Sequence, residues 1–230
     1  MTVEMALRGA RVRYGPLEAL HGLDLPVPAA TVTLLLGRNG SGRTTALRAL
    51  AGTVPLAAGR VRWRGADVTG WRAHERARRG LCFVPDRQAV HGGLTVAENL
   101  ALAARGAAPD PALDAYPALA ALLPRTAGTL SGGEQRMLAV CRALLAPRTD
   151  PATGRPAVLL LDEPAQGMAP ATADRTYALL AALARDGAAV VLAEQGVPAA
   201  LALPGVLVHE LRRGGLAFSG EAVEPRAAGE

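Results

Sequence analysis

Short, continuous runs of apolar residues punctuate this chain and predict the strands of a buried sheet. These runs are Thr31 to Leu36, Leu81 to Val84, Ala157 to Leu161 and Ala188 to Ala193. A strand that is covered on both faces carries apolar side chains at nearly every position, as in parallel sheets. Near the N-terminus, Val3 to Tyr14 alternates apolar and polar residues, which predicts a strand or hairpin arm with one exposed face.

Segments in which apolar residues recur at helical spacing separate these runs. Thr44 to Ala51 and Ala171 to Arg185 are expected to be helices. From Thr95 onward, Ala and Leu recur at intervals of three and four residues. Gly106 to Pro111 breaks that pattern, and a second helical piece is expected from about Leu113 to Leu123. Strands that alternate with helices predict an α/β protein built on a parallel sheet.

Ser131 is placed to begin one more helix. Glu134 follows it three residues later, which is the spacing of a capping box, and a helix is therefore expected through about Leu145. Pro147 to Pro156 is rich in residues that form turns and predicts a surface loop.

Composition limits the possible partners. The 230 residues are 50% hydrophobic and fit one domain with an inserted subdomain. The net charge is only +5, and the sequence pI of about 10.2 is high because every one of the 25 basic residues is Arg and no Lys titrates near pH 10, so the pI is weak evidence for nucleic acid. Aromatic residues make up 3% of the chain, and no aromatic-basic ladder of the kind that stacks bases is present, which argues against direct nucleic-acid binding.

The densest basic run, Arg72 to Arg79, is compatible with an acidic partner or lipid headgroups, but a solvated helix face is favoured. The first 14 residues lack the apolar segment of a secretory signal. The most apolar stretch, Ala188 to His209, is interrupted by polar residues and prolines and is not expected to cross a bilayer. Cys82 and Cys141 have no metal-ligand spacing and fit a reducing compartment.

A glycine-rich segment between the first buried run and the first expected helix has the pattern of a phosphate loop. Glycines let consecutive backbone N–H groups converge on β- and γ-phosphates, and the following helix adds the positive end of its dipole. The threonine that opens the helix can ligate a Mg²⁺ ion that bridges the phosphates. The expected nucleotide-binding residues of this segment are Gly37, Asn39, Gly40, Ser41, Gly42, Arg43, Thr44 and Thr45, with Thr44 on the metal.

Arg43 departs from this pattern, which has Lys after the last glycine. A planar guanidinium is wider than an ammonium and prefers bidentate geometry. Loss of one well-placed charge-stabilising donor costs roughly 10²–10³ in turnover, so retained binding with slowed hydrolysis is one expectation. The alternative is that a chain without Lys has accommodated Arg here without consequence.

Two carboxylates end the third apolar run. Asp162 is expected to hold Mg²⁺, and Glu163 to act as the general base that orients the attacking water. A strand end with two acids is common by itself, but here it lies downstream of a phosphate loop.

The six residues from Leu130 to Gln135 read Leu-Ser-Gly-Gly-Glu-Gln, and this segment gives the chain its resemblance to the ATPase subunits of ABC transporters. The resemblance covers nearly the whole chain. It implies a phosphate-loop NTPase core with a mixed sheet flanked by helices, an inserted helical subdomain and an N-terminal antiparallel β subdomain. The corresponding boundaries are 1–92 and 157–230 for the nucleotide-binding core and 93–156 for the helical subdomain that carries the signature.

The same resemblance assigns further roles. Ser131, Gly132 and Gly133, together with Gln135, match the signature that contacts a nucleotide held by the opposite subunit. Tyr14 matches the aromatic residue that stacks on adenine. ATP and Mg²⁺ are the implied ligands. The implied partners are transmembrane permease subunits, a second ABC ATPase subunit in a homo- or heterodimer and, indirectly, an extracytoplasmic solute-binding protein, with the chain on the cytoplasmic face of the cell membrane.

Several segments are most similar to ATPases of branched-chain amino-acid importers, with urea importers as close relatives. They are Val84 to Asp86, Leu94 to Leu100, Ala169-Pro170 and Ala193 to Gln195. In that resemblance Asp86 stands at the position that senses the γ-phosphate, where it can ligate Mg²⁺ or a bridging water, and Gln195 replaces the switch His.

Ala165 to Met168 replaces the usual dimer-contact loop and lacks its acid, and the helical arm between Leu100 and Leu130 is short. Three hypotheses are compatible with these residues. The leading one is an ATPase that drives import of a small solute, for which the resemblance implies a branched-chain amino acid. The second is a nucleotide-binding but hydrolysis-impaired partner in a heterodimer. A soluble ABC ATPase acting on ribosomes or DNA is disfavoured, because neither fused cassettes nor a long coiled-coil insertion is present.

Overall fold

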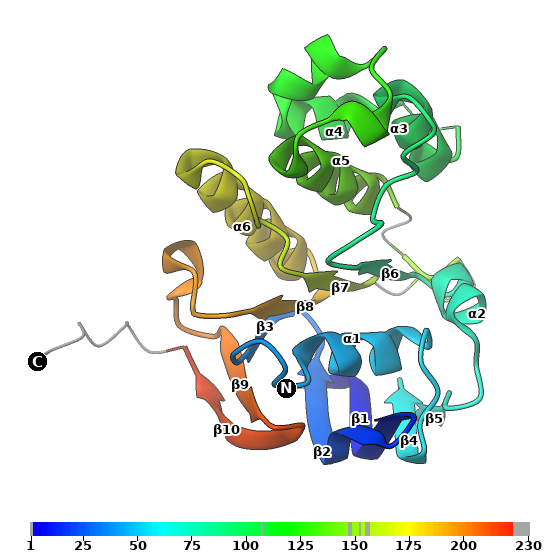
Figure 1. Ribbon diagram of the computed structural model, residues 1–230, viewed down its shortest axis with the longest axis vertical. Coiled ribbons are helices and arrows are strands. Elements are labelled where there is room, and N and C mark those ends of the chain that lie inside the picture. The colour runs from blue at the N-terminus through cyan, green and yellow to red at the C-terminus, as the bar shows by residue number, and fades with distance from the viewer. Residues whose placement is uncertain (1, 107, 147–148, 152, 155–156, 223–230) are drawn as a thin grey trace, which may run out of the picture.

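A mixed sheet at the centre of the molecule carries the expected buried strands (Figure 1). The computed structural model describes residues 2–106, 108–146, 149–151, 153–154 and 157–222. In it the sheet has the order β10-β9-β3-β8-β7-β6, in which β3, β6, β7, β8 and β9 run parallel and β10 is antiparallel. Its strands are β3 (Thr31–Leu36), β6 (Leu81–Val84), β7 (Val158–Asp162), β8 (Ala189–Glu194), β9 (Leu207–Arg212) and β10 (Gly215–Glu221). Continuous burial of β7 and β8 agrees with their apolar sequences.

A second, antiparallel sheet lies below the first and has the order β2-β1-β4-β5. Its strands are β1 (Val3–Tyr14), β2 (Leu17–Pro28), β4 (Ala58–Trp63) and β5 (Ala66–Asp67). Helix α1 (Arg43–Ala51) lies between the two sheets, and its apolar face shares one core cluster with residues of both. This sandwich holds the N-terminal end of α1 against the edge of the central sheet, as a phosphate-binding helix requires.

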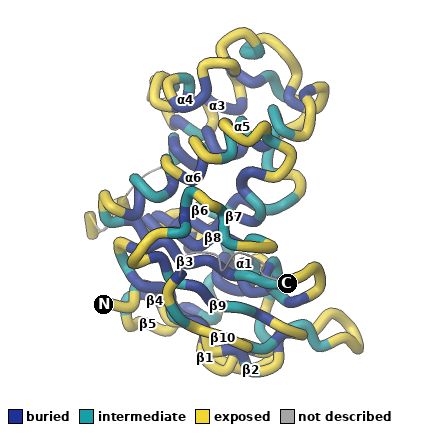
Figure 2. The backbone as a smooth tube through the Cα atoms, turned by 90° about the vertical axis from the view of Figure 1, so that its left-hand side faces the viewer, coloured by how far each residue is buried: buried dark blue, intermediate teal, exposed yellow. Residues whose placement is uncertain are grey.

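The other face of the central sheet is covered by α6 (Pro170–Arg185) and by α5 (Gly132–Leu145), which share a second core cluster. Above α5 lie α3 (Val96–Ala104), α4 (Asp110–Ala115) and the short 3-10 segments η1 (Pro117–Leu122) and η2 (Ala127–Thr129), while η3 (Ala199–Leu201) follows β8. Figure 2 shows that burial follows this division, because the central strands are dark and the outer turns of the upper helices are exposed. The observed architecture confirms the predicted fold class.

Capping boxes begin two of the helices on this side. Ser131 Oγ accepts from the Glu134 amide at 3.3 Å, and Glu134 Oε2 accepts from the Ser131 amide at 2.8 Å. Thr95 and Glu98 make the same reciprocal pair at the start of α3. The predicted capping box at Ser131 is therefore confirmed. Helix α5 also ends at Leu145, as expected.

The helix predicted from about Leu113 to Leu123 is wrong as a single element. Helix α4 ends at Ala115, and η1 begins at Pro117. The residue before a proline is pushed out of the α region, and Tyr116 accordingly has φ −137° and ψ 81°. The chain turns at that point, which lets Leu119 pack into the core.

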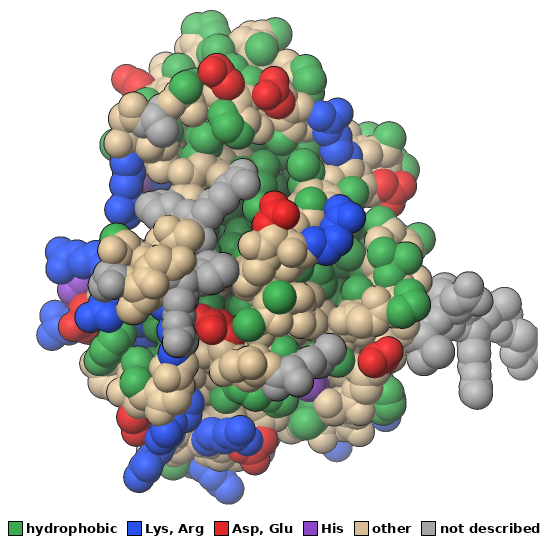
Figure 3. All heavy atoms as spheres, turned by 180° about the vertical axis from the view of Figure 1, so that it is seen from behind, with side chains coloured by type: hydrophobic (Ala, Val, Ile, Leu, Met, Phe, Trp, Pro, Cys, Tyr) green, Lys and Arg blue, Asp and Glu red, His purple; other side chains and the backbone are tan. Residues whose placement is uncertain are grey.

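The basic run contains one residue that is not solvated. Helix α2 (Ala73–Arg78) exposes most of its charges, and Figure 3 shows basic side chains gathered at that edge of the molecule. Arg76, however, is 1% exposed and donates to the carbonyls of Ala49, Leu50 and Val68 at 2.9, 2.6 and 2.9 Å. Burial lowers its pKa to about 10. The sequence-based prediction of a solvated face is therefore wrong at Arg76, which caps the last turn of α1.

The predicted surface loop at Pro147 to Pro156 lies partly outside the described residues, at 147–148, 152 and 155–156. At Asp150 the prediction is wrong, because this residue is 2% exposed. Its Oδ2 lies 2.7 Å from Nη1 of Arg64, whose Nε is 2.6 Å from Glu4 Oε1. An ion-pair network therefore fastens this segment to the antiparallel sheet.

Candidate active site

Four neighbouring parallel strands end at one edge of the central sheet, and each delivers predicted site residues there. The phosphate loop follows β3, Gln195 follows β8, Asp162 and Glu163 end β7, and Asp86 lies just beyond β6. These strands are adjacent in the order β3-β8-β7-β6. Ligands of open α/β sheets bind at the carboxyl ends of the strands. The order of strands in space thus brings together residues that are more than 150 positions apart in the chain.

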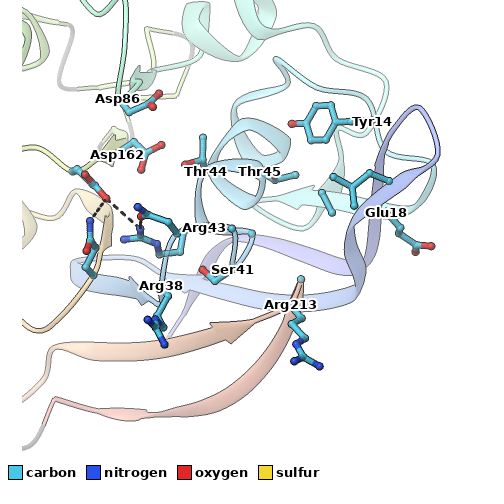
Figure 4. A pocket seen from close by; sticks show the side chains of 18 of the residues that line it. Tyr14, Glu18, Arg38, Ser41, Arg43, Thr44, Thr45, Asp86, Asp162 and Arg213 are labelled. Carbon is cyan, nitrogen blue, oxygen red and sulfur yellow. Dashed lines mark hydrogen bonds and ion pairs between the residues drawn. The ribbon is translucent and has the colours of Figure 1, made fainter.

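A cleft of about 690 Å³ lies at this edge (Figure 4). Most of the predicted nucleotide-binding and metal-binding residues line it. They are Tyr14, Asn39, Gly40, Ser41, Gly42, Arg43, Thr44, Thr45, Asp86, Asp162, Glu163 and Gln195. Gly37, which begins the loop, does not line the cleft.

The phosphate loop needs its glycines for space. A Cβ on Gly37 would lie 2.5 Å from Ser41 Oγ and 2.6 Å from the Leu211 carbonyl oxygen. Gly42 has φ +106°, a conformation that side chains rarely adopt, and it immediately precedes α1. The loop is held by the turn between β9 and β10, because the Gly214 amide donates to the Ser41 carbonyl at 2.9 Å. The first residues of α1, Arg43, Thr44 and Thr45, line the cleft, so the N-terminal end of this helix faces it.

Arg43 occupies the position at which a lysine was expected, and its side chain points along the strand ends. It is 6% exposed, and its Nη2 lies 3.1 Å from Glu163 Oε1. The same carboxylate oxygen accepts from Nε2 of Gln195 at 3.3 Å. Both contacts appear as dashed lines in Figure 4. The guanidinium is therefore paired with the residue predicted to be the general base.

Glu163 adopts a backbone conformation that is uncommon for a non-glycine residue, with φ +46°. Its amide donates to the Ala193 carbonyl at 3.0 Å. Strain of this kind persists only where surrounding structure enforces it, and it concentrates at functional sites. The turn directs the Glu163 carboxylate towards the phosphate loop rather than along β7.

Asp162 is 2% exposed at the end of β7. Burial raises the pKa of its carboxyl, while a hydrogen bond with the Thr44 side chain and the charge of Arg43 oppose that rise. Asp86 lies across the cleft, and its carboxylate is 3.7 Å from Nη2 of Arg48. Thr44, Asp86 and Asp162 therefore offer oxygen atoms from three different elements.

Several buried polar atoms of the cleft have no hydrogen-bond partner within the described part of the chain. They are Ser41 Oγ, Arg43 Nη1, Asp86 Oδ1 and Asp162 Oδ2. Buried polar groups are nearly always hydrogen-bonded. A hydroxyl and a guanidinium on one side and carboxylate oxygens on the other fit a polyphosphate accompanied by a hard cation that prefers oxygen ligands.

Glu194, at the end of β8, is a further acid near these carboxylates, and sequence reasoning assigned it no role. Tyr177 Oη donates to its Oε1 at 2.7 Å. Burial raises the pKa of Glu194 to about 7, and the charges of Glu163 and Asp162 act in the same direction. The only sequence signal was its position beside Gln195.

Other lining residues were also missed. Arg38 and Arg213 lie at the rim, and no ion pair joins either of them to a carboxylate among the described residues. Arg213 has φ +48° in the turn that supports the phosphate loop. Glu18 and His21 come from β2, a strand that the sequence did not predict, so only tertiary structure places them here.

The signature residues are outside this cleft. Ser131 and Gly132 are exposed at the start of α5, and Gly132 and Gln135 line a separate groove of about 630 Å³. Gly133 packs on the loop after β7, because a Cβ there would lie 2.5 Å from the Gly167 carbonyl oxygen. Gln135 Nε2 donates to the Leu130 carbonyl at 3.2 Å. The structure therefore separates the two glycine-rich segments within one chain.

Comparison with known proteins settles the family. The sequence pattern described as ABC transporter matches residues 20–166. This chain belongs to the ABC transporter family. It is an ATPase subunit of that family.

Sequence relatives sharpen this assignment. The high-affinity branched-chain amino acid transport ATP-binding protein BraG of Pseudomonas aeruginosa is 35% identical over 197 residues, which are 83% of this chain and 81% of that protein. The probable branched-chain amino acid transport ATP-binding protein LivF of Archaeoglobus fulgidus is 34% identical over 219 residues, 92% of this chain and 89% of that protein. The predicted resemblance to this group of ABC ATPases is confirmed.

Solved structures agree on the fold. MJ1267, an ATP-binding cassette of an ABC transporter, superimposes with a TM-score of 0.77 at 23% identity over 96% of this chain and 92% of that one. A bacterial Atm1-family ABC exporter with ATP bound gives a TM-score of 0.80 at 23% identity, over 96% of this chain and 39% of the exporter. Within the described residues, no helix combines the length and apolarity needed to span a bilayer.

Proposed function

We propose that this ABC ATPase subunit binds and hydrolyses ATP to energise import of a small solute of the branched-chain amino-acid class. The observation that carries the proposal is the convergence of the phosphate loop, Asp162, Glu163 and Gln195 in one cleft. The substrate class rests on similarity to BraG and LivF.

Each cleft residue has a role in this proposal. Tyr14 stacks on adenine, and the backbone of the phosphate loop together with Arg43 binds the β- and γ-phosphates. Thr44, Asp86 and Asp162 hold Mg²⁺, which when bound neutralises charge on the phosphate oxygens. Glu163 accepts the proton of the attacking water, and the amide of Gln195, 3.3 Å from that carboxylate, helps to orient the same water.

The signature completes a site on a second cassette. Ser131, Gly132 and Gly133 present the positive end of α5 to solvent, and the exposed Ser131 hydroxyl adds a donor. Because these groups lie outside the cleft of their own chain, we infer that two cassettes bind ATP between the cleft of one and the signature of the other. The second cassette is either a copy of this chain or a different ABC subunit.

The proposed setting is the inner face of the cell membrane, where the pair of cassettes drives transmembrane permease subunits. An extracytoplasmic solute-binding protein would deliver the cargo to the permease. Affinity purification of the tagged chain from its native membrane tests these partners. Recovery of integral membrane proteins supports the proposal, whereas recovery of ribosomal or nucleic-acid partners alone would overturn it.

A direct test of the site uses Glu163→Gln. With the base removed, turnover is expected to fall by about 10²–10⁴ while ATP binding persists. The matched control is Glu210→Gln, which changes a carboxylate on β9 that pairs with Arg212 away from the cleft. Steady-state ATPase rates and calorimetric ATP affinity should both be measured. If Glu163→Gln hydrolyses ATP as fast as the parent, the proposed base is idle.

One observation favours a second candidate function, a subunit that binds ATP but hydrolyses it poorly. The ion pair between Arg43 and Glu163 engages Oε1 of the base in a charge-assisted contact, so the guanidinium competes with the attacking water for that oxygen. In a heterodimer this arrangement would slow only the composite site that contains Arg43. Retention of Glu163 favours hydrolysis, so the impaired subunit remains the alternative.

A further inference from the structure

Residues 85–91 form the segment that carries Asp86, and side chains of α5, the signature helix, hold part of it. Arg136, on the second turn of α5, donates from Nη1 to the Pro85 carbonyl and from Nη2 to the Asp86 carbonyl, each at 2.8 Å. Arg136 is 5% exposed, so both bonds are shielded from water. A planar guanidinium can span two consecutive carbonyls in this way, whereas an ammonium cannot match that fork.

The far half of the same segment has separate supports. Arg142, also on α5, donates to the Ala89 carbonyl and contacts His91 Nε2 at 3.1 Å. Asn99 Oδ1 accepts from the His91 amide at 2.9 Å, and its Nδ2 donates to the His91 carbonyl at 3.0 Å. Among the described residues, Arg136 is therefore the side chain that bonds the backbone at Asp86 itself, while Arg142 and Asn99 secure residues 89–91.

The charge environment of Arg136 points to the active site. Its bonds go to neutral carbonyls rather than to a carboxylate, so its positive charge is not cancelled by an ion partner. Burial lowers its pKa, and the carboxylates that oppose this, beginning with Asp162 and Asp86, belong to the cleft. An apolar side chain could fill the same volume, but it would leave two buried carbonyls without donors, and such losses are costly.

The start of α5 is also fixed on its other side. Gly133 packs against the Gly167 carbonyl so closely that a Cβ would not fit. Arg136 follows one turn later on the same helix and touches the loop after β6. One end of α5 therefore contacts both loops that carry the acidic residues, and it presents Ser131 on its exposed tip.

We propose that Arg136 is a positioning residue that locks the Asp86 segment to the signature helix. The carboxylate that faces the metal in one site and the signature that serves the neighbouring site then move as one unit. This inference rests on the proposed roles of Asp86 and of the signature. It adds to them a specific link that the motif pattern does not contain, because Arg136 does not itself line the cleft but bonds the backbone of Asp86, which does.

The test compares Arg136→Met with Arg142→Met. The second variant removes the same kind of side chain from the same helix, but it removes the contacts with Ala89 and His91 instead. Both variants are expected to unfold at a lower temperature than the parent. Only Arg136→Met should lower kcat, by about tenfold, and raise the Mg²⁺ concentration needed for half-maximal turnover by about as much. Affinity for ATP measured in EDTA should stay unchanged in both variants.

A conservative substitution separates positioning from folding. Arg136→Lys keeps the charge and can donate to one carbonyl at a time, so partial recovery of the Mg²⁺ dependence is expected relative to Arg136→Met. If both Arg136 variants match the parent in Mg²⁺ dependence, or if Arg142→Met shifts it equally, Arg136 is only structural and the inference is overturned.

A double-mutant cycle tests the route through Asp86. In an Asp86→Ala background, Arg136→Met should have no further effect on kcat, because the carboxylate it positions is gone. Multiplicative effects of the two changes would contradict the link. If Asp86→Ala alone leaves turnover unchanged, the link is also overturned.

Failure of the proposed function can be distinguished from failure of this inference. A parent chain that binds no Mg-ATP would refute the proposed function. An active parent that is slowed by Asp86→Ala but not by Arg136→Met refutes this inference alone.

Discussion

The phosphate loop and the signature segment are both glycine-rich, and both open a helix, but the structure treats them differently. Helix α1, which follows the phosphate loop, packs between the two sheets, and Arg43 at its start is buried. The signature segment is exposed at its tip, and the Ser131 amide already donates to Glu134 in its own capping box. Residues of the first segment line the cleft of their own chain, whereas the signature residues lie outside it.

In the proposed function, one cassette therefore contributes one half to each of two sites. Substitutions in the phosphate loop should therefore weaken ATP binding by the isolated chain, whereas substitutions in the signature should lower turnover only in the assembled complex.

The largest effect is expected from Gly37→Ala when it is compared with Gly132→Ala. A Cβ at Gly37 would meet two atoms closer than 2.7 Å, and overpacking of this kind costs about 1–3 kcal/mol, or roughly 10–100-fold in ATP affinity. At Gly132 a Cβ meets nothing within 4 Å. Calorimetry on the isolated chain should thus detect weakened binding only for Gly37→Ala, while the assembled complex loses turnover in both. Weakened binding by isolated Gly132→Ala would erase the distinction.

Ser131→Ala and Thr95→Ala form the next pair, because both residues cap a helix through the same reciprocal bonds. Each should cost about 1 kcal/mol of stability, which lowers Tm by roughly 2–4 °C in a chain of this size. Only Ser131→Ala should also reduce turnover of the complex, by about 10² if its hydroxyl contacts the partner's nucleotide. Thermal unfolding and ATPase assays decide the matter, and equal turnover in the two variants would leave Ser131 with a structural role alone.

A smaller change is expected from Arg43→Lys, which tests the ion pair inside the phosphate loop. A lysine should release Glu163 and place its charge beside the phosphates, so turnover is expected to rise by about tenfold, a part of the 10²–10³ attributable to one well-placed donor. Arg38→Lys is the matched control, since Arg38 is exposed in the same loop and pairs with no carboxylate among the described residues. An unchanged rate for Arg43→Lys would show that this chain accommodates Arg without loss.

The smallest effect is expected for the pH dependence of stability, through Glu194, which lies at the end of β8 near the phosphate-loop side of the comparison. Its pKa is raised to about 7 from an ordinary value near 4.5, so between these two pH values the folded state binds more protons than the unfolded state. Stability therefore falls as pH rises through that window. Glu194→Gln, which can still accept from Tyr177, should raise Tm by a few °C at pH 8 and leave it unchanged at pH 4. A variant that matches the parent at both pH values would contradict the assigned shift.

Local patterns predicted much of the fold because the residues involved act on their immediate neighbours. The apolar runs gave β3, β6, β7 and β8 within about a residue, and the Ser131 capping box gave α5. The sequence failed where distant contacts decide. Strand β2 was missed, since its pattern is irregular and its pairing with β1 contains several register shifts. Arg76 was assigned to a solvated face because its partners, the carbonyls that end α1, are more than 20 residues away.

For the site, the sequence identified the groups but not their contacts. Glycine spacing, a hydroxyl after it and two acids after an apolar run were sufficient to predict phosphate and metal chemistry, because each is required locally by the ligand. Sequence comparison then placed the chain among ABC ATPases. No pattern along the chain indicated that Arg43 pairs with Glu163, since these residues are 120 positions apart.

What the sequence by itself determined is therefore many of the helices and strands and the kinds of chemical group expected at their ends, because hydrophobic periodicity, capping and glycine conformation are properties of short segments. Tertiary structure alone decided which strand ends lie side by side, which arginine is buried and which loops α5 fastens. Those outcomes depend on the order of strands across the sheet and on the desolvation of charges, and both arise only when distant segments pack together.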